Sequence, residues 1–101
     1  MNYKIRYSEY SINSIIEIYN YIAFSLLNEA AAYKTIKGIT NVIDNLIFFP
    51  RKNRIYKVYN ISKDVRITHY KKYIILYLID DNENTIFIQN VFYNRRNIKN
   101  A

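Results

Sequence analysis

The feature that most constrains this chain is residues 64–96, where short polar segments separate three runs dense in β-branched and aromatic residues. The runs are residues 65–70, 73–79 and 85–93, and the segments between them are Lys71 with Lys72, and residues 80–84. Such runs joined by such short links favour three antiparallel strands in a meander. The first link lacks the Asn-Gly of a tight turn, so a loop longer than two residues is an alternative. The register between the first two strands of the meander is therefore open by one residue.

A strand and a helix are predicted before the meander. Residues 2–7 alternate apolar and polar side chains, as in a strand with one buried face. Ser8 can cap a helix that runs from Glu9 to about Leu27. Its apolar positions recur at spacings of three and four and form one continuous stripe, namely Ile12, Ile15, Ile16, Tyr19, Ile22, Ala23 and Leu26.

A second helix is predicted between Asn28, a suitable N-cap, and Pro50, which ends it. Gly38 costs this helix up to ~1 kcal/mol. Residues 51–60 form a basic connection in which residues 54–59 are predicted to add a short strand. One face of the second helix is apolar, formed by Ala32, Ile36, Ile39, Ile43, Leu46 and Ile47.

These elements predict an α+β fold of order β-α-α-β-β-β in a single domain over residues 1–101. Two helices form one layer, so as a hairpin they cover only one face of the sheet. Residues 73–79 are nevertheless apolar on both faces, with Ile74, Leu76 and Leu78 on the side opposite Tyr73 and Ile75. A strand of this kind lies between two layers. We expect a partner to cover the open face, and a homodimer or a folded-back tail are alternatives.

Charge divides the chain into two halves. Residues 1–50 hold four cations and four anions, whereas residues 51–101 hold eleven cations and four anions, so the net charge of +7 comes from the second half. A one-sided basic field attracts polyanions and makes their binding salt-dependent. This asymmetry predicts a nucleic acid, the ribosome or an acidic protein as partner, and a merely solvated basic surface is the alternative.

The composition also narrows the chemistry. The chain has no cysteine, which excludes disulfides, thiolate metal sites and a cysteine nucleophile and fits a cytoplasmic protein. The longest apolar run is far shorter than the ~20 residues that cross a bilayer, and the first twenty residues lack the apolar core of a secretory signal. We therefore expect a protein without metal or cofactor that does not bind a membrane.

The order of elements and several residue runs resemble the RelE/ParE superfamily, the toxins of bacterial type II toxin–antitoxin systems. The resemblance covers nearly the whole chain. The runs that carry it are SIIEIYNYI at residues 14–22, AAAYKTIKGITNVIDNLIFFP at residues 30–50, DVRI at residues 64–67, YIILYLID at residues 73–80 and VFYNRRN at residues 91–97.

The resemblance implies a compact β-α-α-β-β-β fold whose open, basic sheet face is the working surface. A cognate antitoxin normally blocks the toxin by wrapping around it, which implies a toxin–antitoxin hetero-oligomer and assigns antitoxin binding to Ile74, Leu76 and Leu78. The superfamily contains gyrase inhibitors resembling ParE and ribosome-dependent mRNA endonucleases resembling RelE and YoeB. Target or nucleic-acid binding is predicted at Arg66, His69, Lys71, Lys72, Arg95 and Arg96.

Metal-free RNA cleavage needs a base, cations at the phosphate and an acid for the leaving oxygen. Arg96 matches the last-strand arginine of the RelE-like branch, and Arg66 lies near a basic position. Tyr93 is the candidate third catalytic group, and His69, Lys71 or Lys72 are alternatives to it. The central-strand arginine of that branch falls at Ile74, however, and no Tyr or His follows Arg96. We therefore lean to ParE-like inhibition of DNA gyrase, with an mRNA interferase as the alternative and a basic RNA-binding module as a remote one.

Each candidate residue also has a structural interpretation. Arg66 can pair with Asp64 or Asp81, and His69 can be an ordinary residue at a strand end. Lys71 and Lys72 can form a solvated hairpin tip, and Tyr93 can be a core or rim aromatic. Arg95 and Arg96 are the strongest functional candidates, because two adjacent cations at the end of a strand have no role in a core.

Overall fold

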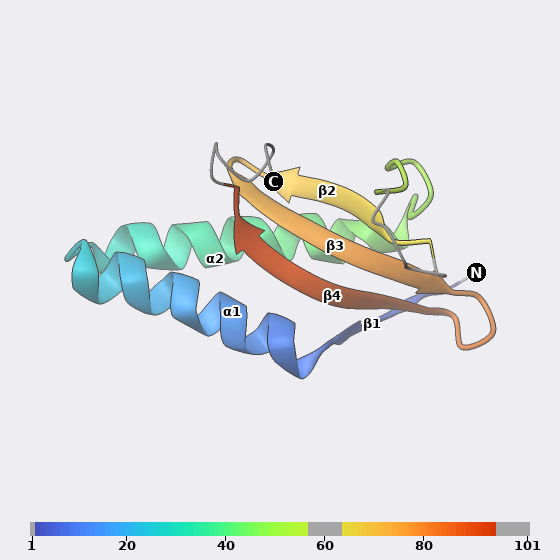
Figure 1. Ribbon diagram of the computed structural model, residues 1–101, viewed down its shortest axis with the longest axis horizontal. Helices are drawn as coiled ribbons and strands as arrows, with labels where there is room; N and C mark the ends of the chain where they lie inside the picture. Colours follow the sequence, from blue (N-terminus) through green and yellow to red (C-terminus); the bar gives the residue numbers. More distant parts are fainter. Residues whose placement is uncertain (1, 57–63, 95–101) are drawn as a thin grey trace.

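The computed structural model describes residues 2–56 and 64–94. It confirms the α+β class and the predicted β-α-α-β-β-β order (Figure 1). The elements are β1 (Lys4–Tyr7), α1 (Glu9–Asn20), a π-helical turn η1 (Tyr21–Ser25), α2 (Glu29–Asp44), a 3-10 turn η2 (Asn45–Ile47), β2 (Arg66–Tyr70), β3 (Tyr73–Asp80) and β4 (Thr85–Tyr93).

The four strands form one mixed sheet in the order β1-β4-β3-β2. β1 runs parallel to β4, and the other neighbours are antiparallel. Tyr70 pairs with Tyr73, so the β2–β3 loop has only two residues. The sequence analysis allowed a longer loop here, and that alternative is wrong. The tight turn forms without Asn-Gly because Lys71 itself adopts φ 52, a left-handed conformation that usually selects Gly or Asn.

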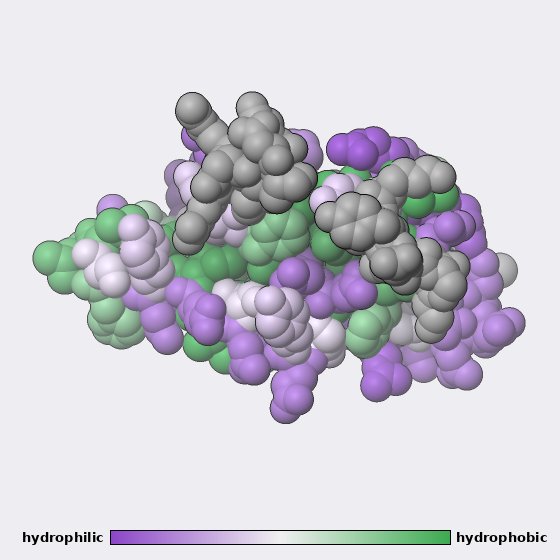
Figure 2. All heavy atoms as spheres, viewed as in Figure 1, coloured by the Kyte–Doolittle hydropathy of each residue, from purple (hydrophilic) through white to green (hydrophobic). Residues whose placement is uncertain are grey.

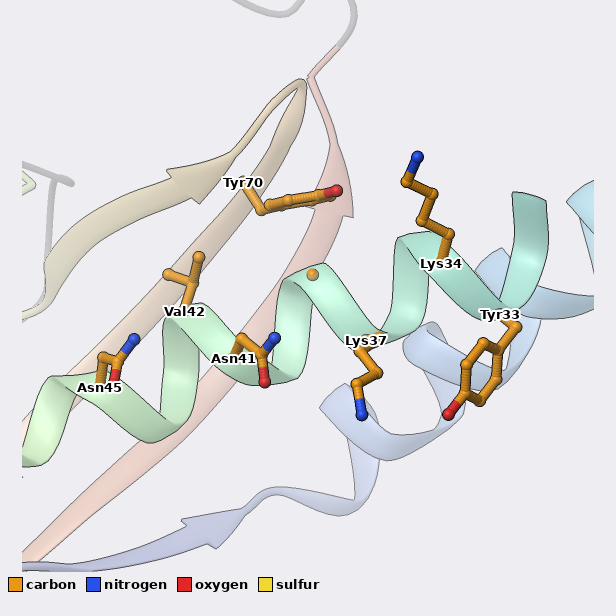
Figure 3. Close-up of a pocket in the computed structure, with 8 residues that line it drawn as sticks. Tyr33, Lys34, Lys37, Asn41, Val42, Asn45 and Tyr70 are labelled. Carbon is orange, nitrogen blue, oxygen red and sulfur yellow. The ribbon is translucent and has the colours of Figure 1, made fainter. Parts of the chain in front are cut away.

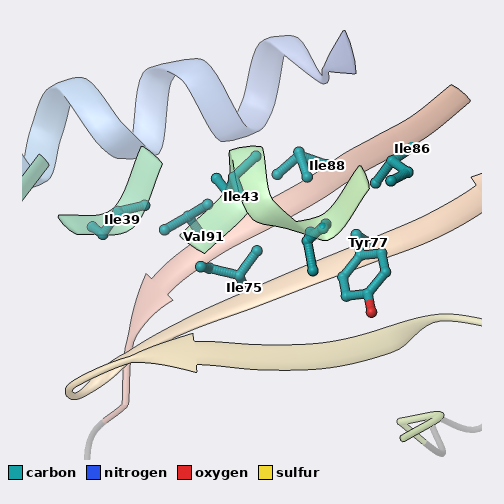
Figure 4. Close-up of a cluster of buried hydrophobic side chains, with 8 residues drawn as sticks. Ile39, Ile43, Ile75, Tyr77, Ile86, Ile88 and Val91 are labelled. Carbon is teal, nitrogen blue, oxygen red and sulfur yellow. The ribbon is translucent and has the colours of Figure 1, made fainter. Parts of the chain in front are cut away.

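Both helices lie on one side of the sheet, behind the strands in Figure 1. Alternate residues of β3 and β4 point into this space and meet two isoleucines of α2 (Figure 4). The Tyr77 hydroxyl in this core donates to the Pro50 carbonyl at 2.6 Å and accepts from Asn53 Nδ2 at 3.1 Å. The side chains of the core that are fully buried are Ile39, Ile43, Ile75, Tyr77, Ile86, Ile88 and Val91.

The opposite face of the sheet carries Ile74, Leu76 and Leu78, as the alternation of β3 predicts. These side chains are half-buried, whereas Ile75 and Tyr77 on the helix side are fully buried. Neither α1 nor α2 lies on this face (Figure 1). Within the described residues, the two helices therefore shield one face of the sheet only.

The first helix departs from its predicted apolar stripe. The α-helix ends at Asn20 rather than near Leu27, and η1 follows it. Four members of the stripe are buried or packed against the core, namely Ile15, Tyr19, Ile22 and Ala23. Ser11 and Ile18 join this face, whereas Ile12, Ile16 and Leu26 are exposed. Ser11 is buried because its hydroxyl donates to the Ser8 carbonyl at 2.8 Å, so a polar residue takes the place that the stripe gave to an isoleucine.

The helix caps follow the sequence prediction. The Ser8 side chain accepts from the Ser11 amide and the Asn28 side chain accepts from the Ala31 amide, both at 2.9 Å. The apolar face of the second helix is likewise buried or packed against the core. Gly38 has a packing role, because the ring of Tyr70 occupies the space that a Cβ atom would fill. Close approach of β2 to α2 thus explains a glycine inside this helix.

The extra strand predicted at residues 54–59 is reduced to a bridge between Ile55 and Arg66. Tyr56 N donates to the Val65 carbonyl at 2.6 Å, and Ile67 N donates to the Arg54 carbonyl at 3.1 Å. Residues 57–59 of that prediction lie outside the described part of the chain. In the described segments, no helix has the length and apolar character needed to span a bilayer.

Candidate functional site at the cationic end of the sheet

One end of the sheet gathers cations and tyrosines from three strands. Tyr73 pairs with Tyr93, and their rings meet edge to face with centroids 5.3 Å apart. Asn94 N donates to the Lys72 carbonyl at 2.7 Å, so the chain leaving β4 passes beside the β2–β3 turn. We call this region the cationic end, defined by Tyr70, Lys71, Lys72, Tyr73 and Tyr93.

Tyr70 connects the cationic end to the helical layer. The Lys71 ammonium lies 5.6 Å from the centroid of the Tyr70 ring, which is within cation–π range. The same ring lies over α2 at Gly38, beside a groove of about 450 Å³ that Lys34 and Lys37 also line (Figure 3). The turn is thus held against α2 by an aromatic side chain, and the ammonium groups remain exposed.

The predicted binding residues fall on two faces of β2. His69 pairs with Ile74 and is exposed on the open face, whereas Arg66 pairs with Tyr77 on the helix side. The structure therefore brings His69 near Lys71 and Lys72 but separates all three from Arg66. Arg95 and Arg96 lie outside the described residues.

Arg66 has a structural partner that the sequence did not reveal. Its Nη1 atom donates to the carbonyls of Asn53 at 2.7 Å and of Arg51 at 3.3 Å. The alternative pairing with Asp64 or Asp81 is wrong, because the only ion pair in the described residues joins Arg51 to Asp81. Arg66 thus fastens the loop after α2 to β2, and no side-chain pattern marks a bond to backbone carbonyls.

The far end of the same sheet carries the opposite charge. Asp80, Asp81 and Glu83 lie in and beside the β3–β4 turn. Asp81 accepts from Arg51 and, at 3.1 Å, from the Tyr3 hydroxyl. The hydrogen bond from Arg51, followed by that from Tyr3, lowers the pKa of the Asp81 carboxyl, and the bond to Asp81 raises the pKa of Arg51. We call this region, with Asp80, Asp81 and Glu83, the anionic end. Its Asp81 carboxylate is held by contacts with two other segments of the chain.

Tyr73 is a poor proton acceptor. Burial raises the pKa of Tyr73, and the nearby Tyr93 and Tyr21 raise it further. Tyr73 is consequently a neutral phenol at neutral pH, and it can donate a hydrogen bond or stack but does not serve as a base. The described residues contain no group of His, Asp or Glu side chains arranged to hold a metal ion.

The open face continues from the cationic end. Cross-strand pairing sets Ile74 beside Phe92 and Leu78 beside Phe87, so two phenylalanines extend the predicted surface of Ile74, Leu76 and Leu78. Alternation along β4 does not indicate both residues, because Phe87 and Phe92 have opposite parity and lie on one face only because a bulge separates them. Figure 2 shows hydrophobic residues in the middle of this view with hydrophilic residues around them.

The chain is similar to known toxins in sequence and in structure. Residues 5–98 match the family model described as the ParE toxin of the type II toxin–antitoxin system parDE. No protein among the curated ones matches the chain.

Three solved structures show the same fold. The chromosomal ParDE system from P. aeruginosa superposes with a TM-score of 0.75 and 12% identity, over 92% of this chain and 97% of that chain. The RelBE2 complex from Mycobacterium tuberculosis gives 0.63 and 15%, over 92% of each chain. The isolated RelE toxin of E. coli gives 0.62 and 11%, over 93% of this chain and 86% of that one.

Proposed function

The chain belongs to the ParE toxin family of type II toxin–antitoxin systems, and we propose that it arrests growth when free of its antitoxin by binding and blocking DNA gyrase. In this mode the toxin performs no chemistry of its own. The cationic end is the contact surface, with Lys71 and Lys72 exposed at a two-residue turn and the basic pair Arg95 and Arg96 following β4 in the sequence. Cations on such a surface attract DNA phosphates or acidic protein groups.

The separation of Arg66 from the rest of the site is the observation that carries this proposal. RNA cleavage requires cations and a proton acceptor around one phosphate. Arg66 is bound to the carbonyls of Arg51 and Asn53 on the helix side, whereas His69 faces the opposite way. This arrangement favours a binding mode over the RelE-like set of Arg66, Arg96 and Tyr93.

We also propose that the cognate antitoxin covers the open face at Ile74, Leu76 and Leu78. A half-buried apolar surface without a covering helix is suited to a protein partner. Solved relatives of this fold include toxin–antitoxin complexes, which supports an antitoxin as that partner.

The first test is induced expression in a bacterial host without any antitoxin. The wild-type chain should stop growth, and Arg96→Ala should relieve the arrest while the protein accumulates to the same level. Wild-type protein that accumulates in folded form and leaves growth unchanged would refute the toxin assignment.

The second test separates the two targets in the arrested cells. Gyrase inhibition should produce accumulated gyrase–DNA cleavage complexes with intact mRNA. Codon-phased cuts in mRNA with normal gyrase activity would instead establish the interferase, and Arg66 would then need a role beyond its bonds to Arg51 and Asn53.

A further inference from the structure

The groove beside Tyr70, which we call the α2 groove, follows the exposed side of α2 and has a volume of about 450 Å³. Residues four apart lie one above the other on a helix, and two such rows line the groove (Figure 3). The first row is Tyr33, Lys37, Asn41 and Asn45, and the second is Lys34, Gly38 and Val42, with the Tyr70 ring beside it.

The α2 groove is cationic, because two lysines line it and, among the described residues, no carboxylate does. Lys34 and Lys37 are exposed, and neither takes part in an ion pair with another described residue. The acids of α2 are Glu29 and Asp44, which lie at its two ends and do not line the groove. A concave surface that carries charges of one sign concentrates ions of the other sign. The chemistry of the groove therefore suits an anion.

The length of the groove suits a chain of anionic groups. From Lys34 to Asn45 the helix rises by about 17 Å, which matches about five phosphates along one DNA strand. The track continues beyond α2, because the Lys71 ammonium lies over the Tyr70 ring at 5.6 Å from its centroid. The α2 groove and the cationic end thus form one continuous surface, which a single small anion would occupy only in part.

The groove offers little to an unpaired base. Proteins that bind single strands use aromatic faces on which successive bases stack. The Tyr70 ring is covered by α2 at Gly38 and by the Lys71 ammonium, so Tyr33, which is 63% exposed, is the one free ring of the lining. Exposed side-chain amides, such as those of the first row, donate to phosphate oxygens as lysines do. A row of cations and amides without a stacking platform fits the backbone of a duplex.

From these features we infer that the α2 groove binds the sugar–phosphate backbone of duplex DNA. Lys34 and Lys37 contact phosphates of one strand, and the Asn41 amide donates to the same strand. The backbone then continues past Tyr70 to Lys71. The inference rests on the proposed function and deepens it, because the DNA that gyrase holds becomes a direct ligand of the toxin.

The first test measures binding of a labelled DNA duplex to the full toxin chain by fluorescence anisotropy over a range of salt concentrations. Lys34→Gln with Lys37→Gln removes both charges and preserves helix propensity. Each lost phosphate contact lowers the slope of log K against log salt by about 1, so the double variant should lose about 2. At ~0.1 M salt its binding should weaken roughly 10- to 100-fold.

Lys4→Gln with Lys52→Gln is the matched control, because it makes the same change in net charge at exposed positions outside the groove. This variant should keep the wild-type salt slope. Circular dichroism checks that both double variants are folded. An equal loss of slope in the two variants, or a wild-type chain that does not bind the duplex, overturns the inference.

Two further probes test the choice of ligand. An unlabelled single strand of the same sequence should compete more weakly than the duplex, and a single strand that competes better overturns the assignment to duplex DNA. Purified gyrase without DNA should bind the Lys34→Gln, Lys37→Gln variant as it binds wild type. Weaker binding to DNA-free gyrase, with unchanged binding to the duplex, would assign the groove to a protein partner and overturn the inference.

The inference and the proposed function fail in different ways. A wild-type chain that binds the duplex through Lys34 and Lys37 but leaves gyrase active and growth unchanged refutes the proposed function and leaves the groove result intact. Gyrase inhibition by a groove variant whose salt slope equals that of wild type overturns the inference and leaves the proposed function intact.

Discussion

The two ends of the sheet carry opposite charges, and the chain uses them differently. At the anionic end, Asp81 is bonded to Arg51 and Tyr3, and Asp80 accepts from the amides of its own turn. At the cationic end, neither Lys71 nor Lys72 has an acidic partner in the described residues. β3 joins the two ends directly, so the difference lies in the turns and not in the strands.

This contrast shows why net charge alone does not locate a binding site. Arg51 and Arg66 contribute to the +7 charge, but both hold the loop after α2 to the sheet. A cation engaged in this way is less available to a partner. The lysines of the β2–β3 turn are free of such contacts among the described residues, and they are therefore available to bind an anion.

The largest expected effect comes from reversing the charge of the cationic end. The double variant Lys71→Glu with Lys72→Glu should weaken target binding roughly 100-fold, since like-charge contacts at an interface cost several kcal/mol. Growth arrest should be lost at normal expression levels. Because both residues are exposed, the free energy of unfolding should change by no more than about 0.5 kcal/mol.

A matched control distinguishes local charge from total charge. Lys52→Glu with Arg54→Glu makes the same change in net charge at two exposed positions of the loop after α2. This variant should remain toxic. If both double variants lose toxicity equally, the molecule responds to its overall charge, and the cationic end is not a specific surface.

The next effect concerns the support under the cationic end. In Gly38→Ala the new methyl group would overlap with the Tyr70 ring, which must move. We expect a net destabilisation of about 1–3 kcal/mol, because the cost of overpacking exceeds the ~1 kcal/mol gain in helix propensity. Urea unfolding measures the sign directly. A more stable variant would show that the ring shifts freely and does not anchor the turn.

The sequence predicted most of the fold because periodicity records burial. The alternation of β3 correctly placed Ile75 and Tyr77 in the core and Ile74 and Leu76 on the open face. Alternation separates the two faces of β3 reliably, but both faces are apolar, so it was the family resemblance that assigned Ile74 and Leu76 to the open side. The helix caps were also predicted correctly. Few residue types have a side chain that accepts a hydrogen bond from the first helical amides, and Ser8 is one of them.

The sequence did not predict the features that depend on tertiary contacts with the backbone. Arg66 binds carbonyl groups, and every residue has a carbonyl, so no residue type indicates that partner. The face of α1 was displaced because buried Ser11 satisfies its hydroxyl locally, while Ile12 and Ile16 remain outside. An apolar stripe cannot show which of its members has a layer to pack against.

A smaller effect is expected in the anionic turn. Asp80 Oδ1 accepts from Asn82 N at 3.0 Å and from Glu83 N at 3.2 Å. Asp80→Ala should destabilise the protein by about 1 kcal/mol, because it removes a side-chain cap of two amides. Folded Asp80→Ala protein should arrest growth like the wild type. Loss of toxicity without loss of folded protein would extend the working surface to this end.

The smallest effect is the pH dependence of the pair between Arg51 and Asp81. The pKa of Asp81 is lowered in the folded protein, so the pair stabilises the fold above the ordinary aspartate pKa of about 3.9. That contribution is lost as the pH falls through the lowered pKa, because the unfolded state then binds the proton more readily. Unfolding curves of wild type and Asp81→Asn should therefore converge with falling pH.

The same curves should converge in 1 M salt at neutral pH, since both partners are exposed and salt screens such pairs. The other carboxylates titrate alike in the two proteins, so the difference between the curves isolates this pair. A difference that stays constant with pH and salt would mean that Asp81 acts through its neutral hydrogen bonds. The anionic end would then owe its order to hydrogen-bond geometry, and charge would distinguish only the lysine turn from the rest of the sheet.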